Sequence, residues 1–320
     1  MNGVLAFALA VLIYPGVAVA LVAAWALSWA RQSARAVTGG SAIPGPLRDV
    51  NELRSEIERD TITPHGVSAR FLNVVSSLAV VFPLLALVLL PVPGNPLVNS
   101  IGLKGDIALE GGLLLGVPVM RLLVAWAIPS PYTRIAADRG VRLLAGVVVT
   151  MVLALTAIAE QLATLTLNVE PSKTALPTFA IITRILAALA FIFTLPALAR
   201  VSALRAGHGN LEVSAGELSE VSGQDLAGFR LAEAVQLVAV AAVFVAVFVV
   251  PIFPTVAGTG RALVWIVGII LTALGIGAWE GYASREATSA ERPPLNWWLG
   301  WPILLAMLAL VAAAWAARGV

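Results

Sequence analysis

The sequence predicts an all-α polytopic membrane protein with about eight transmembrane helices. Of its 320 residues, 59% are hydrophobic and only 12% are charged, whereas soluble domains have roughly 45–50% apolar and about 25% charged residues. So few polar residues could not cover a core of this size in water. Apolar stretches of the roughly 20 residues that cross a bilayer also recur along the chain. We therefore expect lipid to surround most of the protein.

Eight stretches are long and apolar enough to span a membrane, and together they form a single transmembrane domain over residues 1–320. The first lacks a basic segment in front of it and is too long for a signal peptide, so we interpret it as a retained helix. Three tryptophans at the start of the last stretch are typical of a membrane interface. The predicted spans are 3–30, 71–92, 107–128, 141–167, 177–199, 229–253, 263–279 and 297–317.

Basic residues are distributed unevenly between the two sides of the predicted membrane domain. The positive-inside rule places the more basic loops in the cytoplasm, which puts both termini outside. The loops after the first, third, fifth and seventh spans hold Arg31, Arg35, Arg48, Arg54, Arg59, Arg70, Arg134, Arg139, Arg142, Arg200, Arg205, Arg285 and Arg292. The other side holds only Lys104, Lys173, Arg261 and Arg318.

Two long cytoplasmic loops are predicted, and the first, residues 31–70, contains a short amphipathic helix. After a Gly/Pro-rich break, Leu47, Val50, Leu53 and Ile57 recur at helical spacing with charged residues between them. This helix could be a solvated connector, an interfacial helix lying on the membrane, or a docking site for a soluble partner.

The second loop, residues 200–228, is acidic. Together with Glu233, just inside the sixth span, its carboxylates form the densest acidic cluster near the membrane. Composition alone would also allow an ordinary hydrophilic loop. The acids are Glu212, Glu217, Glu220 and Asp225.

Ionisable residues within spans are costly and mark functional positions. Glu110 and Arg121, 11 residues apart, would share one face of the third span, about 16 Å apart along its axis. Glu160 and Arg184 would both lie toward the outer leaflet on consecutive helices, so we expect them to pair. Glu280 is expected at the membrane interface. The intramembrane set is Glu110, Arg121, Glu160, Arg184, Glu233 and Glu280.

Several kinds of centre are excluded by composition. There is no cysteine, so thiolate metal sites and iron–sulfur clusters cannot be held by this chain. His65 and His208 both fall in polar segments, which argues against haem ligation between spans, and we predict no metal site. No phosphate-binding or dinucleotide fingerprint is present, and a net charge of +2 gives no reason to expect nucleic acid.

The acidic loop resembles that of a known family. The run from Glu212 to Gly223 followed by Glu233 is similar to the pattern Glu-Leu-x-x-Gly-x-x-x-Glu-Tyr-Ser-Gly in membrane subunit 1 of respiratory complex I and its relatives in formate hydrogenlyase and energy-converting hydrogenases. Val221 replaces the aromatic residue. The segments 45–49 and 130–139 resemble the family's amphipathic helix and the hydrogenase branch's Ser-Pro-Phe segment. Near Arg200 the sequence departs from the family, because the Pro and Asp of Arg-x-Pro-Phe-Asp are absent.

The resemblance implies a membrane-anchoring and ion-coupling subunit of a complex-I-like oxidoreductase without a redox centre of its own. It implies a bacterial or archaeal inner membrane, a quinone at the interface, and partners of two kinds: cluster-bearing peripheral-arm subunits and antiporter-like membrane subunits. The alternative function is a stand-alone secondary transporter. The implied coupling loop is Arg200, Glu212, Glu217, Glu220 and Asp225; the proton path Glu233, Glu110, Glu160, Arg121 and Arg184; and the peripheral-arm interface Arg48, Asp49, Arg134 and Arg139.

Overall fold

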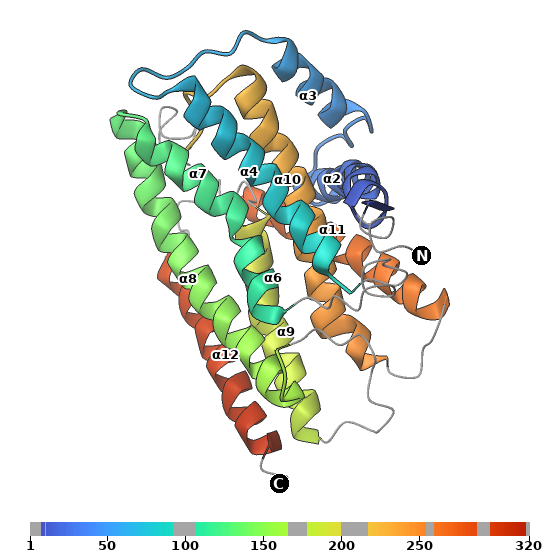
Figure 1. Ribbon diagram of the computed structural model, residues 1–320. Helices are drawn as coiled ribbons and strands as arrows, with labels where there is room; N and C mark the ends of the chain where they lie inside the picture. The colour runs from blue at the N-terminus through green and yellow to red at the C-terminus, as the bar shows by residue number, and fades with distance from the viewer. Residues whose placement is uncertain are drawn as a thin grey trace.

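A computed structural model describes residues 8–9, 11–91, 106–165, 178–199, 217–253, 259–286 and 295–317. Most of the long helices run side by side, while one long helix crosses them and one short helix lies across one end (Figure 1). The helices are α2 (Val17–Gly39), α3 (Arg48–Glu58), α4 (Ala69–Leu89), α6 (Ile107–Leu114), α7 (Gly116–Ala127), α8 (Pro131–Leu162), α9 (Thr178–Leu198), α10 (Gly223–Phe244), α11 (Thr259–Glu286) and α12 (Leu295–Ala317).

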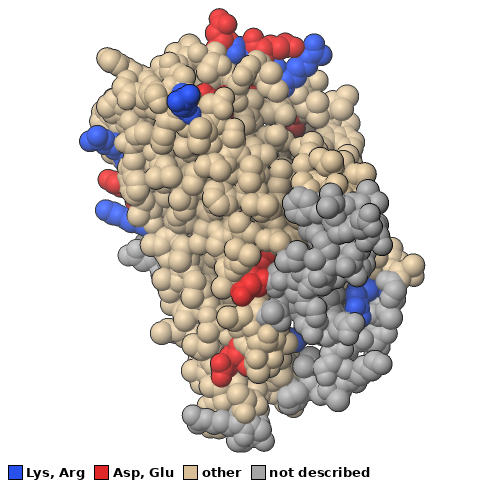
Figure 2. All heavy atoms as spheres, viewed as in Figure 1, with Lys and Arg blue, Asp and Glu red and all other residues tan. Residues whose placement is uncertain are grey.

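The predicted all-α membrane fold is confirmed. Within the described ranges, seven helical stretches are long and apolar enough to cross a membrane, with α6 and α7 counted as one. The amphipathic helix expected after the first span is α3. Figure 2 shows charged side chains gathered at the end of the molecule where α3 lies, above a broad face of other residues.

The first and third predicted spans differ from their helices. In place of an unbroken helix ending near Ala30, α2 begins at Val17 after a turn and continues to Gly39, where Gly40 ends it with a φ of 73°. The third span, predicted as one helix, is divided at Leu115 into α6 and α7. The division has a covalent cause, because Pro118 has no N–H to bond to the carbonyl of Leu114.

Helix α10 is the axis of the bundle. It packs against α2, α3, α4, α6, α7, α9 and α11, and small residues let its neighbours approach from every side. After Phe244 the chain continues as a π-helical turn (Val245–Val249) and then a 3₁₀ turn (Val250–Ile252). There Phe248 lies beside Phe191 of α9, with ring centroids 5.2 Å apart.

Helices α2 and α11 pack with their backbones in contact, as small residues four apart permit between membrane helices. A Cβ atom added at Gly277 would lie 2.1 Å from the carbonyl oxygen of Arg31, and one added at Gly281 would lie 2.5 Å from that of Arg35. Next to Gly281, Glu280 forms an ion pair with Arg35 at 3.1 Å and is buried. Glu280 is therefore held against α2 by this ion pair.

We predict that Gly277→Ala destabilises the protein by about 1–3 kcal/mol, because the new methyl group would overlap backbone that cannot move aside. The loss would appear as a lower midpoint of thermal unfolding in detergent. Gly275→Ala, two residues away on α11, is the matched control because nothing lies within 4 Å of a Cβ there. Equal midpoints for the two variants would contradict this account of the α2–α11 contact.

Candidate functional site

Helix α3 is fixed to the bundle at both of its ends. Near its start, the Asp49 carboxylate accepts hydrogen bonds of 2.6 and 2.7 Å from the Gln32 side-chain amide and a further bond from the Ser28 hydroxyl of α2. Near its end, the buried Glu56 carboxylate lies 3.3 Å from the Arg230 guanidinium of α10. The short amphipathic helix thus bridges two long helices that are far apart in sequence.

The segment after α3 crosses the start of α10 at close range. Gly223 has a φ of 65°, and a Cβ atom there would lie 2.7 Å from the Cα of Thr61. The Ser222 hydroxyl oxygen accepts a hydrogen bond of 3.0 Å from the N–H of Ile62. Within the first turn of α10, the buried Asp225 accepts a bond of 3.3 Å from Ser76 of α4. The two loops predicted from sequence therefore meet at the entrance to α10.

An ionic cluster lies directly below this entrance. The guanidinium of Arg121, from α7, contacts two carboxylates: its Nε atom is 3.3 Å from Glu217 and its Nη1 atom is in direct contact with Glu233 of α10. Arg121 and Glu217 are buried, and the Glu233 side chain is 19% exposed. We call these three residues the ionic triad. It joins the end of the acidic loop to two of the predicted intramembrane charges.

A glycine makes room for the loop residue of the triad. A Cβ atom at Gly140 of α8 would lie only 2.6 Å from the Glu217 carboxylate oxygen. The carboxylate therefore occupies the space that a side chain at position 140 would take. Three helices and the turn at 217–220 thus build one site, in which a single guanidinium faces two acids.

A second polar contact lies one turn further along α10. The Gln236 side-chain amide donates a hydrogen bond of 2.6 Å to the carbonyl oxygen of Leu114, and Gln236 is almost fully buried. This is the carbonyl that Pro118 leaves without a backbone donor, so Gln236 supplies the missing N–H. Sequence reasoning missed Gln236, although Pro118 within a span signals an unpaired carbonyl four residues earlier.

Glu110 extends this polar line along α6. It lies one helical turn before Leu114 and is 1% exposed. Among the residues that the structure describes, neither of its carboxylate oxygens has a hydrogen-bond partner. Glu110 thus lies on the same short helix as the Leu114 carbonyl that Gln236 contacts.

The predicted ion pair between Glu160 and Arg184 is wrong. The Arg184 guanidinium donates to Gln161 instead, at 3.3 Å, while Glu160 is exposed on the outer side of α8. Adjacent residues on a helix differ by about 100° in direction, so only one of these two could face α9. Gln161 occupies the place that the pattern of charges had suggested for Glu160.

The other predicted site residues lie at the surface or outside the described ranges. Glu220 is exposed on the turn that carries Glu217, and Arg134 and Arg139 are exposed on the first turns of α8. Arg48 is also exposed and pairs with Glu52 at 2.8 Å. Arg200 and Glu212 lie outside the residues that the structure describes.

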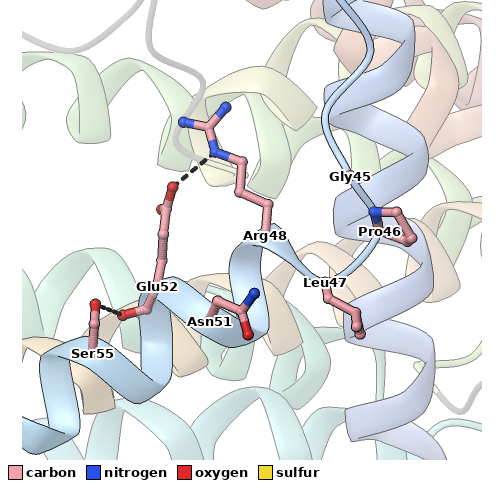
Figure 3. Close-up of a pocket in the computed structure, with 7 residues that line it drawn as sticks. All are labelled: Gly45, Pro46, Leu47, Arg48, Asn51, Glu52 and Ser55. Atoms are coloured by element: carbon pink, nitrogen blue, oxygen red, sulfur yellow. Dashed lines mark hydrogen bonds and ion pairs between the residues drawn. The ribbon is translucent and has the colours of Figure 1, made fainter.

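An open groove of about 620 Å³ runs along the polar side of α3 (Figure 3). Its walls are formed by Gly45, Pro46, Leu47, Arg48, Asn51, Glu52 and Ser55. Sites for flat apolar ligands are usually enclosed and lined mainly by hydrophobic side chains. This groove is open rather than enclosed, so we assign no ligand to it.

The fold and the ionic triad define a multi-pass membrane protein with a charged centre inside its helix bundle. A family model described as NADH dehydrogenase matches residues 5–316. The chain therefore belongs to the NADH dehydrogenase family, and the resemblance to membrane subunit 1 of complex I is confirmed.

Comparison with solved structures supports the fold. The chain is similar to one in the structure of the membrane-bound sulfane sulfur reductase, an archaeal respiratory membrane complex, with a TM-score of 0.70 and 20% sequence identity. The match covers 96% of this chain and 99% of that one. A search of curated protein sequences found no match. Neither the family match nor the structural match supports a stand-alone transporter.

We predict that Arg121→Gln destabilises the protein by about 3–5 kcal/mol, because the buried Glu217 and the partly buried Glu233 lose the guanidinium that they share. Unfolding in a denaturing detergent would measure the loss. Arg54→Gln is the control: it breaks an exposed pair with Glu58, and exposed pairs contribute under about 1 kcal/mol. Removing the two acids as well (R121Q/E217Q/E233Q) should restore most of the stability. An R121Q protein as stable as R54Q would contradict the prediction.

A second prediction tests the role of Gln236. Gln236→Leu should cost about 1–3 kcal/mol, because the buried Leu114 carbonyl loses its donor. Pro118→Ala supplies a backbone N–H at the position from which an α-helix would satisfy that carbonyl. The double variant should therefore lose less stability than Q236L alone, as judged by the same unfolding measurement. Strictly additive effects would show that Gln236 and Pro118 do not act on one carbonyl.

Proposed function

We propose that this chain is the membrane-anchoring and ion-coupling subunit of a complex-I-like oxidoreductase. The observation that carries the proposal is the ionic triad, in a chain that belongs to the NADH dehydrogenase family. The triad connects a turn at the surface to two helices in the bundle interior. A change in the position of the loop would therefore reach buried charges directly.

The proposed coupling step is an exchange of partners at Arg121. With Glu217 inserted beside Gly140, the guanidinium is shared between two carboxylates. If redox chemistry in a peripheral arm draws the turn at 217–220 outward, Glu217 leaves and Arg121 faces Glu233 alone. Electrostatic interactions are strong in an apolar interior, so this exchange alters the field that acts on the next polar groups along α10.

The proposed ion path follows the polar line inward. From Glu233, the path passes Gln236 and the Leu114 carbonyl to Glu110, which lies in the interior with both oxygens available. Carboxyl groups buried in a membrane are suited to take up and release protons. The inclusion of Glu160 and Arg184 in this path stays a prediction from sequence.

Partners and location complete the proposal. We propose cluster-bearing peripheral-arm subunits at the end that carries α3 and Glu220, with Arg48, Asp49, Arg134 and Arg139 in the interface, and antiporter-like subunits beside the bundle. Both termini are proposed to lie outside a bacterial or archaeal inner membrane. A quinone at the interface is supported by the resemblance alone, so no step is assigned to it.

The proposal predicts uncoupling without loss of assembly. Glu233→Gln should lower ion pumping per turnover at least about tenfold, since removal of a positioned acid–base group typically costs roughly 10²–10⁴ in rate. Glu220→Gln, on the turn that carries Glu217, should lower it as well. Pumping and electron transfer would be measured together in vesicles that contain the intact complex. Glu58→Gln, an exposed acid on α3, is the control and should pump normally. Normal pumping in both E233Q and E220Q would refute the assignment.

A further inference from the structure

Helix α3 carries a buried carboxylate that two guanidinium groups share. One oxygen of Glu56 accepts a hydrogen bond of 3.1 Å from Arg59, which follows α3 directly, and lies 3.3 Å from Arg230 of α10. Glu52, one turn earlier on α3, also faces Arg230, at 3.8 Å. The Glu56 side chain is 6% exposed, whereas those of Arg59 and Arg230 are 65% and 41% exposed. The contact is thus the reverse of the ionic triad, with one buried acid between two bases.

Arg230 is one of two points at which α10 is held by α3 and the segment that follows it. The other point is Gly223, where the backbone of Thr61 crosses α10 and the Thr61 hydroxyl accepts a hydrogen bond of 3.4 Å from the N–H of Gln224. Seven residues are two turns less about 20°, so Gly223 and Arg230 lie on one side of α10, about 10 Å apart along its axis. This side of α10 is therefore held at two levels.

Helix α4 packs against the opposite side of the same turns of α10 (Figure 1). A Cβ atom at Gly228 would lie 3.2 Å from the Cβ of Ser76, and position 228 points about 160° away from Arg230 around the axis. Ser76 also donates the hydrogen bond to Asp225. The first turns of α10 therefore lie between α3 and α4, which limits how far they can roll about the helix axis.

The position of Glu233 depends on that roll. Glu233 follows Arg230 by three residues, so the two side chains are neighbours on the helix surface, about 60° apart around the axis. An α-helix with its side chains has a radius of about 5–6 Å, so a roll of about 20° would move the Glu233 carboxylate by about 2 Å. Such a displacement would break its direct contact with Arg121. The Glu56 contact and the ionic triad are therefore linked through α10, although they share no residue.

From these observations we propose that Glu56 is a positioning residue for the ionic triad: through Arg230 it holds the start of α10 in the orientation that brings Glu233 to Arg121. The position of a buried acid is thereby tied to α3, a helix at the surface. The consequence for coupling rests on the proposed function, in which a partner subunit that moved α3 would act on Glu233 as well as on the turn at 217–220.

The test is a double-mutant cycle that joins Glu56→Gln and Glu233→Gln, measured by thermal unfolding of the purified protein in detergent. Independent sites lower the midpoint by additive amounts, whereas residues in one network do not. E56Q should lower the midpoint of the wild type, and should lower that of E233Q by about half as much or less, because the charge that Glu56 positions is already absent there. Glu58→Gln, an exposed acid on the same helix, is the control and should be additive with E233Q.

Arg230→Gln provides an independent arm of the same cycle. Its guanidinium is 41% exposed, and its loss leaves Glu56 paired with Arg59, so R230Q disturbs the interior less than E56Q does. R230Q should show the same non-additivity with E233Q, and this result decides the question should E56Q fail to fold. Additive midpoint shifts with E233Q would overturn the proposal.

Ion pumping separates this proposal from the proposed function. In vesicles that contain the intact complex, E56Q and R230Q should lower pumping per turnover while electron transfer continues, and E58Q should not. If E233Q lowered pumping but E56Q and R230Q pumped normally and were additive with it, the coupling role of Glu233 would stand and its positioning by Glu56 would fall. If the cycle showed non-additivity while E56Q, R230Q and E233Q all pumped normally, the positioning would stand and the proposed function would fall.

Discussion

One guanidinium shared between two carboxylates is the contact on which the interior of this protein depends. Removing three charged groups from water is costly, and only mutual pairing at close range offsets that cost. Arg121 can meet both acids because α7, the turn at 217–220 and α10 converge at one point. Two glycines permit this convergence. Gly223 lets the backbone of Thr61 approach the start of α10, and Gly140 leaves room for the Glu217 carboxylate.

The polar contacts beyond the triad obey the rule that a buried carbonyl needs a donor. Pro118 removes one donor from α7, and Gln236 of α10 replaces it. A break in one helix is thereby compensated by a side chain from another. This arrangement explains how a glutamine is retained in the central helix of an otherwise apolar bundle.

Much of the fold could be predicted from the sequence, because hydrophobic length and composition decide which segments enter a membrane. The amphipathic spacing of Leu47 and Ile57 likewise predicted α3. The failures were local. A charge count cannot say which of two neighbouring residues faces an adjacent helix, so Glu160 was chosen where Gln161 makes the contact with Arg184. The partner of Glu280 was not predicted, because Arg35 belongs to a helix distant in sequence.

The charged residues of the site were predicted, but the contacts between them were not. Glu217, Glu233 and Arg121 were each selected for being charged near or within a span, yet nothing in their spacing revealed that they meet. That information resides in tertiary packing, in particular in the glycines that let the elements approach. Gln236 was missed because it is uncharged, and only the proline four residues after Leu114 hints at it.

The hydrogen bond from Gln236 to Leu114 also has a mechanical meaning. A helix interrupted by proline would normally be able to flex at the interruption on its own. Here the junction between α6 and α7 is hydrogen-bonded to α10. Bending at Leu115 therefore requires α10 to tilt or this hydrogen bond to break. A movement of α10 that leaves this hydrogen bond intact would therefore displace the α6–α7 junction with it.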